Sequence, residues 1–175
     1  MRPKHYNIEN GIYFITTRCA RGIAAFNQVT ACEAFLAVLR EKRSAFGFSL
    51  LAYVLMPDHY HLIFQLPEQV TIWKLMNHIN GATSHAINET AEERYAKVWQ
   101  GGFHDVVIRK AQEFAVKVNY VHDNPVRRNL VSRAEDYRYS SSQFYCSQFG
   151  SPYLSTSGFD DFALMGILRA IKTVL

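Results

Sequence analysis

The chain has 175 residues, of which 49% are hydrophobic and 19% are charged, with a formal net charge of +4. These proportions are typical of one folded globular domain and exclude a disordered tail. The net charge is compatible with a polyanionic partner but does not establish one. Three widely spaced cysteines, Cys19, Cys32 and Cys146, argue against a disulfide framework and against a cysteine zinc site.

No apolar run approaches the about 18 residues that are needed to cross a bilayer, so no membrane partner is expected. The N-terminal segment MRPKHYNIENG is basic, but no apolar stretch follows it as it would in a signal peptide. We therefore expect a cytoplasmic protein.

The first elements in the chain are a strand and a helix. The run IYFITTR at 12–18 is rich in β-branched and aromatic residues, which favours a strand. The segment 30–33 fits a capping box, and apolar residues at helical spacing follow it. This pattern predicts a helix that runs to about residue 44.

A hairpin follows, and two histidines lie at the start of its second strand. The segments 48–56 and 59–66 are both apolar, and Pro57-Asp58 joins them with a tight turn. Residues i and i+2 of a strand share one face, so His59 and His61 should project together while the residue between them points away. Two imidazoles on a rigid strand are a ready pair of metal ligands.

The second half of the chain predicts a helix from Ile72 to about Ile87, and then two short strands at 97–100 and 103–109. A third helix should start near Ala111 and run towards Asn124-Pro125. Two short helices are expected beyond it, one capped by the serines 140–142 and one over 161–172.

This order of elements predicts an α+β fold, a ferredoxin-like sandwich in which helices cover one face of a mostly antiparallel sheet. We expect residues 1–145 to form the main domain. Residues 146–175 should form a C-terminal tail with a short helix that belongs to the same unit.

The third predicted helix carries a tyrosine on its polar side. Tyr120 lies off the apolar stripe of this helix and near Lys117, and Asn124 follows it one turn later. One interpretation is a surface tyrosine followed by an Asn-Pro helix terminus. The other is that a hydroxyl and an amide oxygen are offered to the same point in space.

Combined with the histidine strand, the second interpretation gives a catalytic site. His59, His61 and Asn124 would hold a divalent cation with open positions, Mg²⁺ or Mn²⁺ in the cell and Zn²⁺ or Ni²⁺ in vitro. Tyr120 beside such a cation would be able to attack a polarised phosphodiester.

The segments HYH, after an apolar strand and a PD turn, and YVHDNPVRRNLV resemble the single-tyrosine HUH transposases, and among them the REP-associated tyrosine transposases. The segments YFITTR, VWQGGFHDVVIR and YRYSSS extend the resemblance over about residues 6–145. It implies a ferredoxin-like fold and a divalent metal held by His59 and His61, with Asn124 completing the site. It also implies that Tyr120 is the nucleophile, which forms a 5′-phosphotyrosine link to single-stranded DNA and releases a 3′-OH. Tyr60 departs mildly from the bulky hydrophobe usual at its position, and no catalytic role is assigned to it.

The resemblance further implies DNA transposition or rearrangement on REP-type palindromic hairpins, by a monomer or a homodimer. DNA contacts are predicted from charge and position only. The candidates are Lys117, Arg109, Lys110, Arg127, Arg128, Arg2 and Lys4.

Two other functions remain open. One is a domesticated DNA-hairpin-binding protein without transposition activity. The other is a metal-dependent phosphodiesterase that uses activated water and makes Tyr120 dispensable. His104 and Asp105 either hold a ligand imidazole or form a polar pair at a strand edge, whereas His122 is predicted to be a packed core histidine.

Overall fold

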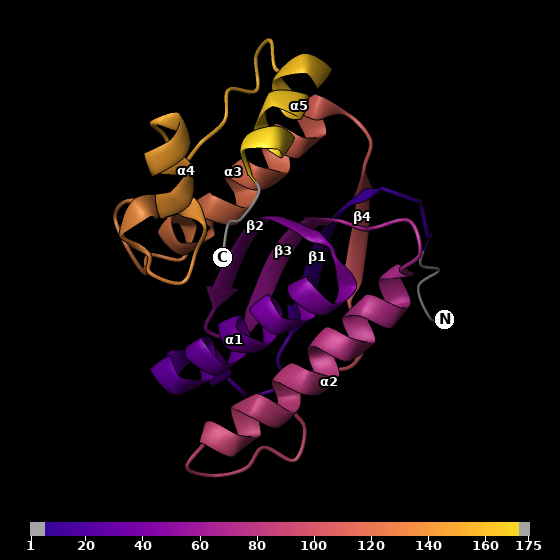
Figure 1. The fold of residues 1–175 in the computed structure, drawn as a ribbon. Helices are drawn as coiled ribbons and strands as arrows, with labels where there is room; N and C mark the ends of the chain where they lie inside the picture. The colour runs from indigo at the N-terminus through magenta and orange to yellow at the C-terminus, as the bar shows by residue number, and fades with distance from the viewer. Residues whose placement is uncertain (1–5, 172–175) are drawn as a thin grey trace.

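A computed structural model, which describes residues 6–171, shows a four-stranded antiparallel sheet between two layers of helices (Figure 1). The strands are β1 (Ile12–Arg18), β2 (Ser49–Met56), β3 (His59–Gln65) and β4 (His104–Ile108). Their order in the sheet is β2-β3-β1-β4, and helices connect β1 to β2 and β3 to β4. This is the connectivity of a ferredoxin-like sandwich, so the predicted fold class is confirmed.

The helices cover both faces of the sheet. On one face lie α1 (Val29–Phe46) and α2 (Ile72–Thr90), which contact each other, whereas α3 (Ala111–Arg127) lies across the other face (Figure 1). The expectation that helices cover one face therefore holds for α1 and α2 but is wrong for α3. Strand β2 explains the difference, because seven of its eight residues are buried, and a strand buried on both sides needs two covering layers.

The end of the chain adds two short helices to the α3 layer, α4 (Ser142–Phe149) and α5 (Asp161–Ala170) (Figure 1). Two 3-10 turns, Ala25–Asn27 and Ala134–Asp136, complete the regular structure. Among the described residues, none of the helices combines the length and the apolar character that a membrane span requires.

The start of α1 differs from the prediction. The N-cap of this helix is Gln28, and no side chain caps it, so the predicted capping box at Thr30 is wrong. The 3-10 turn at Ala25–Asn27 leads almost directly into the helix, which places Thr30 inside the first helical turn. The helix ends at Gly47, whose φ of 71° is the left-handed conformation that favours glycine at this position.

The predicted strand at 97–100 is also wrong, since this segment makes one isolated bridge, between Cys19 and Trp99. Trp99 in this segment is buried, and its ring packs against Phe26 and Phe35. Gly101 and Gly102 then both adopt positive φ, which ends the extended conformation before β4 begins.

The alternation along β3 is as predicted. Tyr60 is fully buried on the face covered by α1 and α2, where it packs against Phe35 and its hydroxyl donates to Asn80. His59 and His61 consequently lie on the opposite face, under α3.

Candidate active site

The two histidines of β3 are the centre of a row of polar side chains across the sheet. Their ring centroids are 4.8 Å apart. In the register of β1 with β3, Arg18 lies opposite His59 and Thr16 lies opposite His61. Thr16 is also opposite His104 of β4. Residues opposite each other in neighbouring strands point to the same face, so three strands contribute to one polar surface.

His61 has one ring nitrogen without a partner. Its Nδ1 atom lies 2.8 Å from the hydroxyl of Thr16, whereas its Nε2 atom is buried and makes no hydrogen bond. Burial, followed by the neighbouring His59, lowers the pKa of His61 to about 3, so the ring is neutral at physiological pH. A neutral imidazole with a buried, unpaired nitrogen is the form that binds a metal ion.

His59 is oriented by the hairpin turn itself. Its Nδ1 atom lies 2.7 Å from Oδ1 of Asp58, so Nε2 is the nitrogen left to face the site. Burial lowers the pKa of His59, and the hydrogen bond and charge of Asp58 oppose that shift. A carboxylate that fixes one nitrogen of an imidazole is the usual support of a metal-binding histidine.

Helix α3 supplies the tyrosine and the asparagine. The Tyr120 ring packs edge-on against His61, at 5.3 Å between centroids, and 38% of the residue is exposed. Asn124, one turn later, is 6% exposed, and the helix continues through Pro125 to Arg127, so Asn124 is helical. The interpretation of Asn124-Pro125 as the helix terminus is therefore wrong, since α3 ends at Arg127.

Two cationic side chains lie close to the Tyr120 ring. The Nζ atom of Lys117 lies 4.7 Å from the centre of the Phe14 ring and 5.9 Å from that of Tyr120. Cζ of Arg127 lies 5.7 Å from the centre of the Tyr120 ring. Positive charge at these positions favours a negatively charged group, such as a phosphate or a phenolate, beside the tyrosine.

These groups share one cleft of about 760 Å³ between the sheet and α3. Its walls contain all four residues of the predicted catalytic site. The lining residues are Phe14, Thr16, Arg18, His59, His61, His104, Lys117, Tyr120, Asn124, Arg127 and Arg128.

The predicted DNA-contacting residues divide into three groups. Lys117, Arg127 and Arg128 line the cleft. Arg109 and Lys110 follow the far end of β4 and line a different hollow, with Ile12 and Ile108. Ile12 is six residues from Arg18 along β1, which corresponds to about 20 Å of strand. Arg2 and Lys4 lie outside the described residues.

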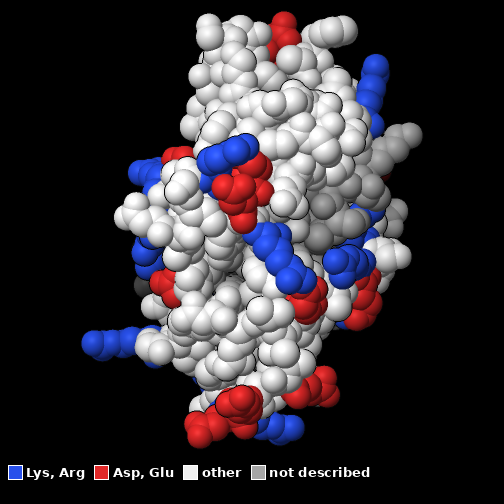
Figure 2. Space-filling view, turned by 90° about the vertical axis from the view of Figure 1, so that its left-hand side faces the viewer, with Lys and Arg blue, Asp and Glu red and all other residues white. Residues whose placement is uncertain are grey.

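The lining of the cleft is more basic than the face of the molecule drawn in Figure 2. Figure 2 shows basic and acidic side chains interspersed on the face that it presents. The cleft lining, in contrast, contains four Lys or Arg residues and no carboxylate.

Three lining residues, Phe14, Thr16 and Arg18, are not among the site residues predicted from the sequence. The signal that would have indicated them is the alternation along IYFITTR, because Phe14, Thr16 and Arg18 share one face of the strand. Thr16 and Asp58 hold the Nδ1 atoms of the two imidazoles, a role that the sequence left open for His104 or Asp105.

His122 is a core residue, as predicted. It is fully buried, and its ring hydrogen-bonds to the carbonyl of Pro152 and to the hydroxyl of Ser141, at 2.7 Å. Burial lowers its pKa to about 4. His122 does not line the cleft.

The residues present fit a divalent cation. Among residues 6–171, no cluster of three His, Cys, Asp or Glu is arranged to hold a metal ion. A site here must therefore use a ligand of another kind beside His59 and His61, and the buried amide of Asn124 meets that need. The unpaired Nε2 atom of His61 is the observation that supports this site.

Comparison with known proteins places this arrangement among transposases. The family model "Transposase IS200 like" matches residues 9–124, which include both histidines, Tyr120 and Asn124. The REP-associated tyrosine transposase of Escherichia coli K12 is 25% identical over 142 residues, covering 79% of this chain and 80% of that protein. A solved structure of a REP-associated tyrosine transposase bound to a REP hairpin covers 85% of this chain and 86% of its own, with a TM-score of 0.74 and 22% identity.

Proposed function

The chain belongs to the family of IS200-like transposases, and from that premise we propose that it nicks and transfers single-stranded DNA through a covalent link to Tyr120. One observation carries this proposal. The half-exposed Tyr120 packs against His61, a neutral imidazole with an unpaired buried nitrogen, in a cleft that also contains cationic side chains. Each group has the chemistry that the reaction needs.

In the proposed reaction, the Tyr120 oxygen attacks the phosphorus of a DNA phosphodiester. The Oη–P bond forms while the bond from phosphorus to the 3′ oxygen breaks, so the downstream strand stays on the tyrosine through its 5′ phosphate. The phenol proton passes to solvent, and the departing oxygen takes up a proton to become a 3′-OH. Lys117 and Arg127, both within 6 Å of the centre of the Tyr120 ring, stabilise the negative charge that develops on the phenol oxygen and the phosphate.

His59, His61 and Asn124, which line the same cleft as Tyr120, would hold a divalent cation. When bound, Mg²⁺ or Mn²⁺ supplies Lewis-acid polarisation of the phosphate oxygens. The chain's own part is to keep both imidazoles neutral by burial and to orient them through Thr16 and Asp58.

The DNA substrate is proposed to be a REP-type palindromic hairpin with a single-stranded flank. Two relatives support this substrate, since the Escherichia coli protein is named for its association with REP sequences and the related solved structure is bound to a REP hairpin. The cleft suits a flexible strand, because its walls combine Phe14 and Tyr120 with cationic side chains such as Lys117.

The test is to incubate the protein with a hairpin oligonucleotide that carries single-stranded flanks, in Mg²⁺ or Mn²⁺, and to resolve the products on a denaturing gel. We expect a protein–DNA adduct that is absent in Tyr120→Phe and in His61→Ala. His78→Ala, which changes an exposed histidine on α2, is the matched control and should form the adduct normally.

The outcome also separates the two alternatives. DNA cleavage that survives Tyr120→Phe would contradict the covalent mechanism and support a water-using phosphodiesterase. Tight hairpin binding without cleavage in either metal would support a domesticated binding protein.

A further inference from the structure

A segment of the tail runs along the outer side of α3 and is held there by side chains of that helix. The Asn119 amide makes two hydrogen bonds with the backbone of Leu154, donating to its carbonyl at 2.8 Å and accepting from its N–H at 2.7 Å. His122 bonds to the carbonyl of Pro152. Residues 152–154 are therefore fixed against the helix that carries Tyr120, and we call them the strap.

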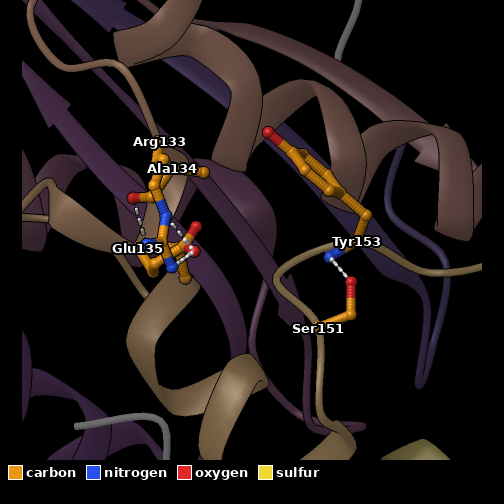
Figure 3. Close-up of polar contacts among 6 residues, drawn as sticks. Arg133, Ala134, Glu135, Ser151 and Tyr153 are labelled. Carbon is orange, nitrogen blue, oxygen red and sulfur yellow. Dashed lines mark hydrogen bonds and ion pairs between the residues drawn. The ribbon is translucent and has the colours of Figure 1, made fainter.

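The middle residue of the strap is a second tyrosine. The backbone N–H of Tyr153 donates to the hydroxyl of Ser151, and the ring projects away from this turn (Figure 3). Its hydroxyl donates to Asp123 of α3 at 3.2 Å, and 40% of the residue is exposed. Figure 3 also shows the ion pair of Arg133 and Glu135, which does not contact the Tyr153 ring. The position of the Tyr153 ring is thus fixed at both ends.

Tyr153 and Tyr120 line a pocket of about 410 Å³, which we call the outer pocket. Its other walls are Val116, Asn119, Asp123 and Arg127. Tyr120 and Arg127 line both this pocket and the reaction cleft, so the two hollows adjoin at the nucleophile. The strap lies beyond residue 124, where the family match ends, so the wall that it builds lies outside the matched region.

We propose that the outer pocket binds the unpaired nucleobase of the nucleotide whose 5′ phosphate becomes linked to Tyr120, an inference that rests on the proposed function. The nucleotide joined to the Tyr120 oxygen would lie beside a residue that lines both hollows, so its base can extend into the outer pocket. Two half-exposed aromatic rings and a guanidinium provide flat and cationic surfaces on which a base stacks, and every base has such a face. Holding this base keeps the linked strand in place after the 3′-OH strand has departed.

The experiment measures DNA binding without turnover, in the Tyr120→Phe background, which keeps the ring but removes the nucleophilic oxygen. A hairpin oligonucleotide in Mg²⁺ carries an abasic site that is moved one nucleotide at a time along its single-stranded flanks. Dissociation constants are measured by fluorescence anisotropy. Tyr153→Leu removes the aromatic ring, and Phe162→Leu, which changes an exposed ring that lines neither hollow, is the matched control.

We expect one abasic position to weaken binding by about tenfold in the background protein and in the Phe162→Leu control. Tyr153→Leu should bind the intact oligonucleotide about tenfold more weakly and lose nothing further at that abasic position. Tyr153→Phe should bind like the background protein, because the ring is retained. A base analogue, 2-aminopurine, placed at this position should lose fluorescence on binding only when residue 153 is aromatic.

The inference fails if the abasic profile is the same with and without the Tyr153 ring, or if no position responds. Its failure is distinguishable from that of the proposed function. Adduct formation by the wild-type protein with a flat abasic profile would overturn only the outer pocket. A Tyr153-dependent position in a protein that forms no adduct would overturn the covalent chemistry and leave only the binding of a base in the outer pocket.

Discussion

The fully buried His122 makes the stability of the protein depend on pH. Burial lowers the pKa of this ring to about 4 in the folded chain, from an ordinary value of 6.5. Between these two values the unfolded chain binds more protons than the folded chain, so the free energy of unfolding falls as the pH falls. The stabilisation is complete above about pH 6.5 and is lost progressively towards pH 4.

The size of the effect follows from the shift. Lowering the pKa of His122 from 6.5 to about 4 changes the free energy of unfolding by about 3 kcal/mol in total, at about 1.4 kcal/mol for each pKa unit. Of this, about 2 kcal/mol should be lost between pH 7 and pH 5. His61, whose pKa burial lowers to about 3, should add a loss of similar size in the same range.

Urea unfolding at pH 7 and pH 5 measures these losses. His122→Gln removes the titrating group but keeps an amide that can donate and accept hydrogen bonds. The variant should be less stable than wild type at pH 7, yet it should lose about 2 kcal/mol less than wild type between the two pH values. His78→Gln, at an exposed histidine, is the control and should follow wild type. An equal loss in His122→Gln and wild type would refute the reasoning.

Three further predictions concern the cation, the strap and the DNA. Asn124→Ala should weaken Mn²⁺ binding at least about tenfold in a calorimetric titration, and an unchanged affinity would remove Asn124 from the ligand set. Asn119→Ala breaks two hydrogen bonds to Leu154 and should cost about 1–3 kcal/mol of the free energy of unfolding, measured by urea denaturation; an unchanged midpoint would show that the strap is not held there. Arg127→Ala should lower the slope of log Kd against log salt concentration for hairpin binding by about one, the value for one lost phosphate contact, whereas Arg109→Ala should leave this slope unchanged. Equal slopes for the two variants would contradict the assignment of DNA binding to the cleft that Arg127 lines rather than to the hollow that Arg109 lines.

Local periodicity was enough to predict the central features of the site. The alternation along β3 placed His59 and His61 on one face and Tyr60 on the other, and the structure has this arrangement. The position of Tyr120 away from the apolar stripe of α3 likewise predicted a side chain on the polar side of that helix, and in the structure Tyr120 lines the cleft. In both cases the face of a residue depends only on the geometry of its own element.

Other features depend on how distant segments pair, which periodicity does not determine. Thr16 and Arg18 become neighbours of the histidines only because β1 lies between β3 and β4 in a particular register. Lys110 is adjacent to α3 in sequence, but it is the N-cap residue, at the end of α3 farthest from Asn124. The strap depends on contacts between residues 30 and 35 positions apart along the chain, which no local pattern reveals.

The turn between β2 and β3 places an unusual constraint on the length of the chain. Only Pro57 and Asp58 separate the two strands, and Asp58 also fixes the ring of His59. Inserting or deleting one residue here would move β3 by one position, and each side chain of that strand would change faces. The histidines would enter the hydrophobic core and Tyr60 would enter the cleft. We therefore expect variants of this protein to differ in length in the long connections, such as the one between α2 and β4, but not in this turn.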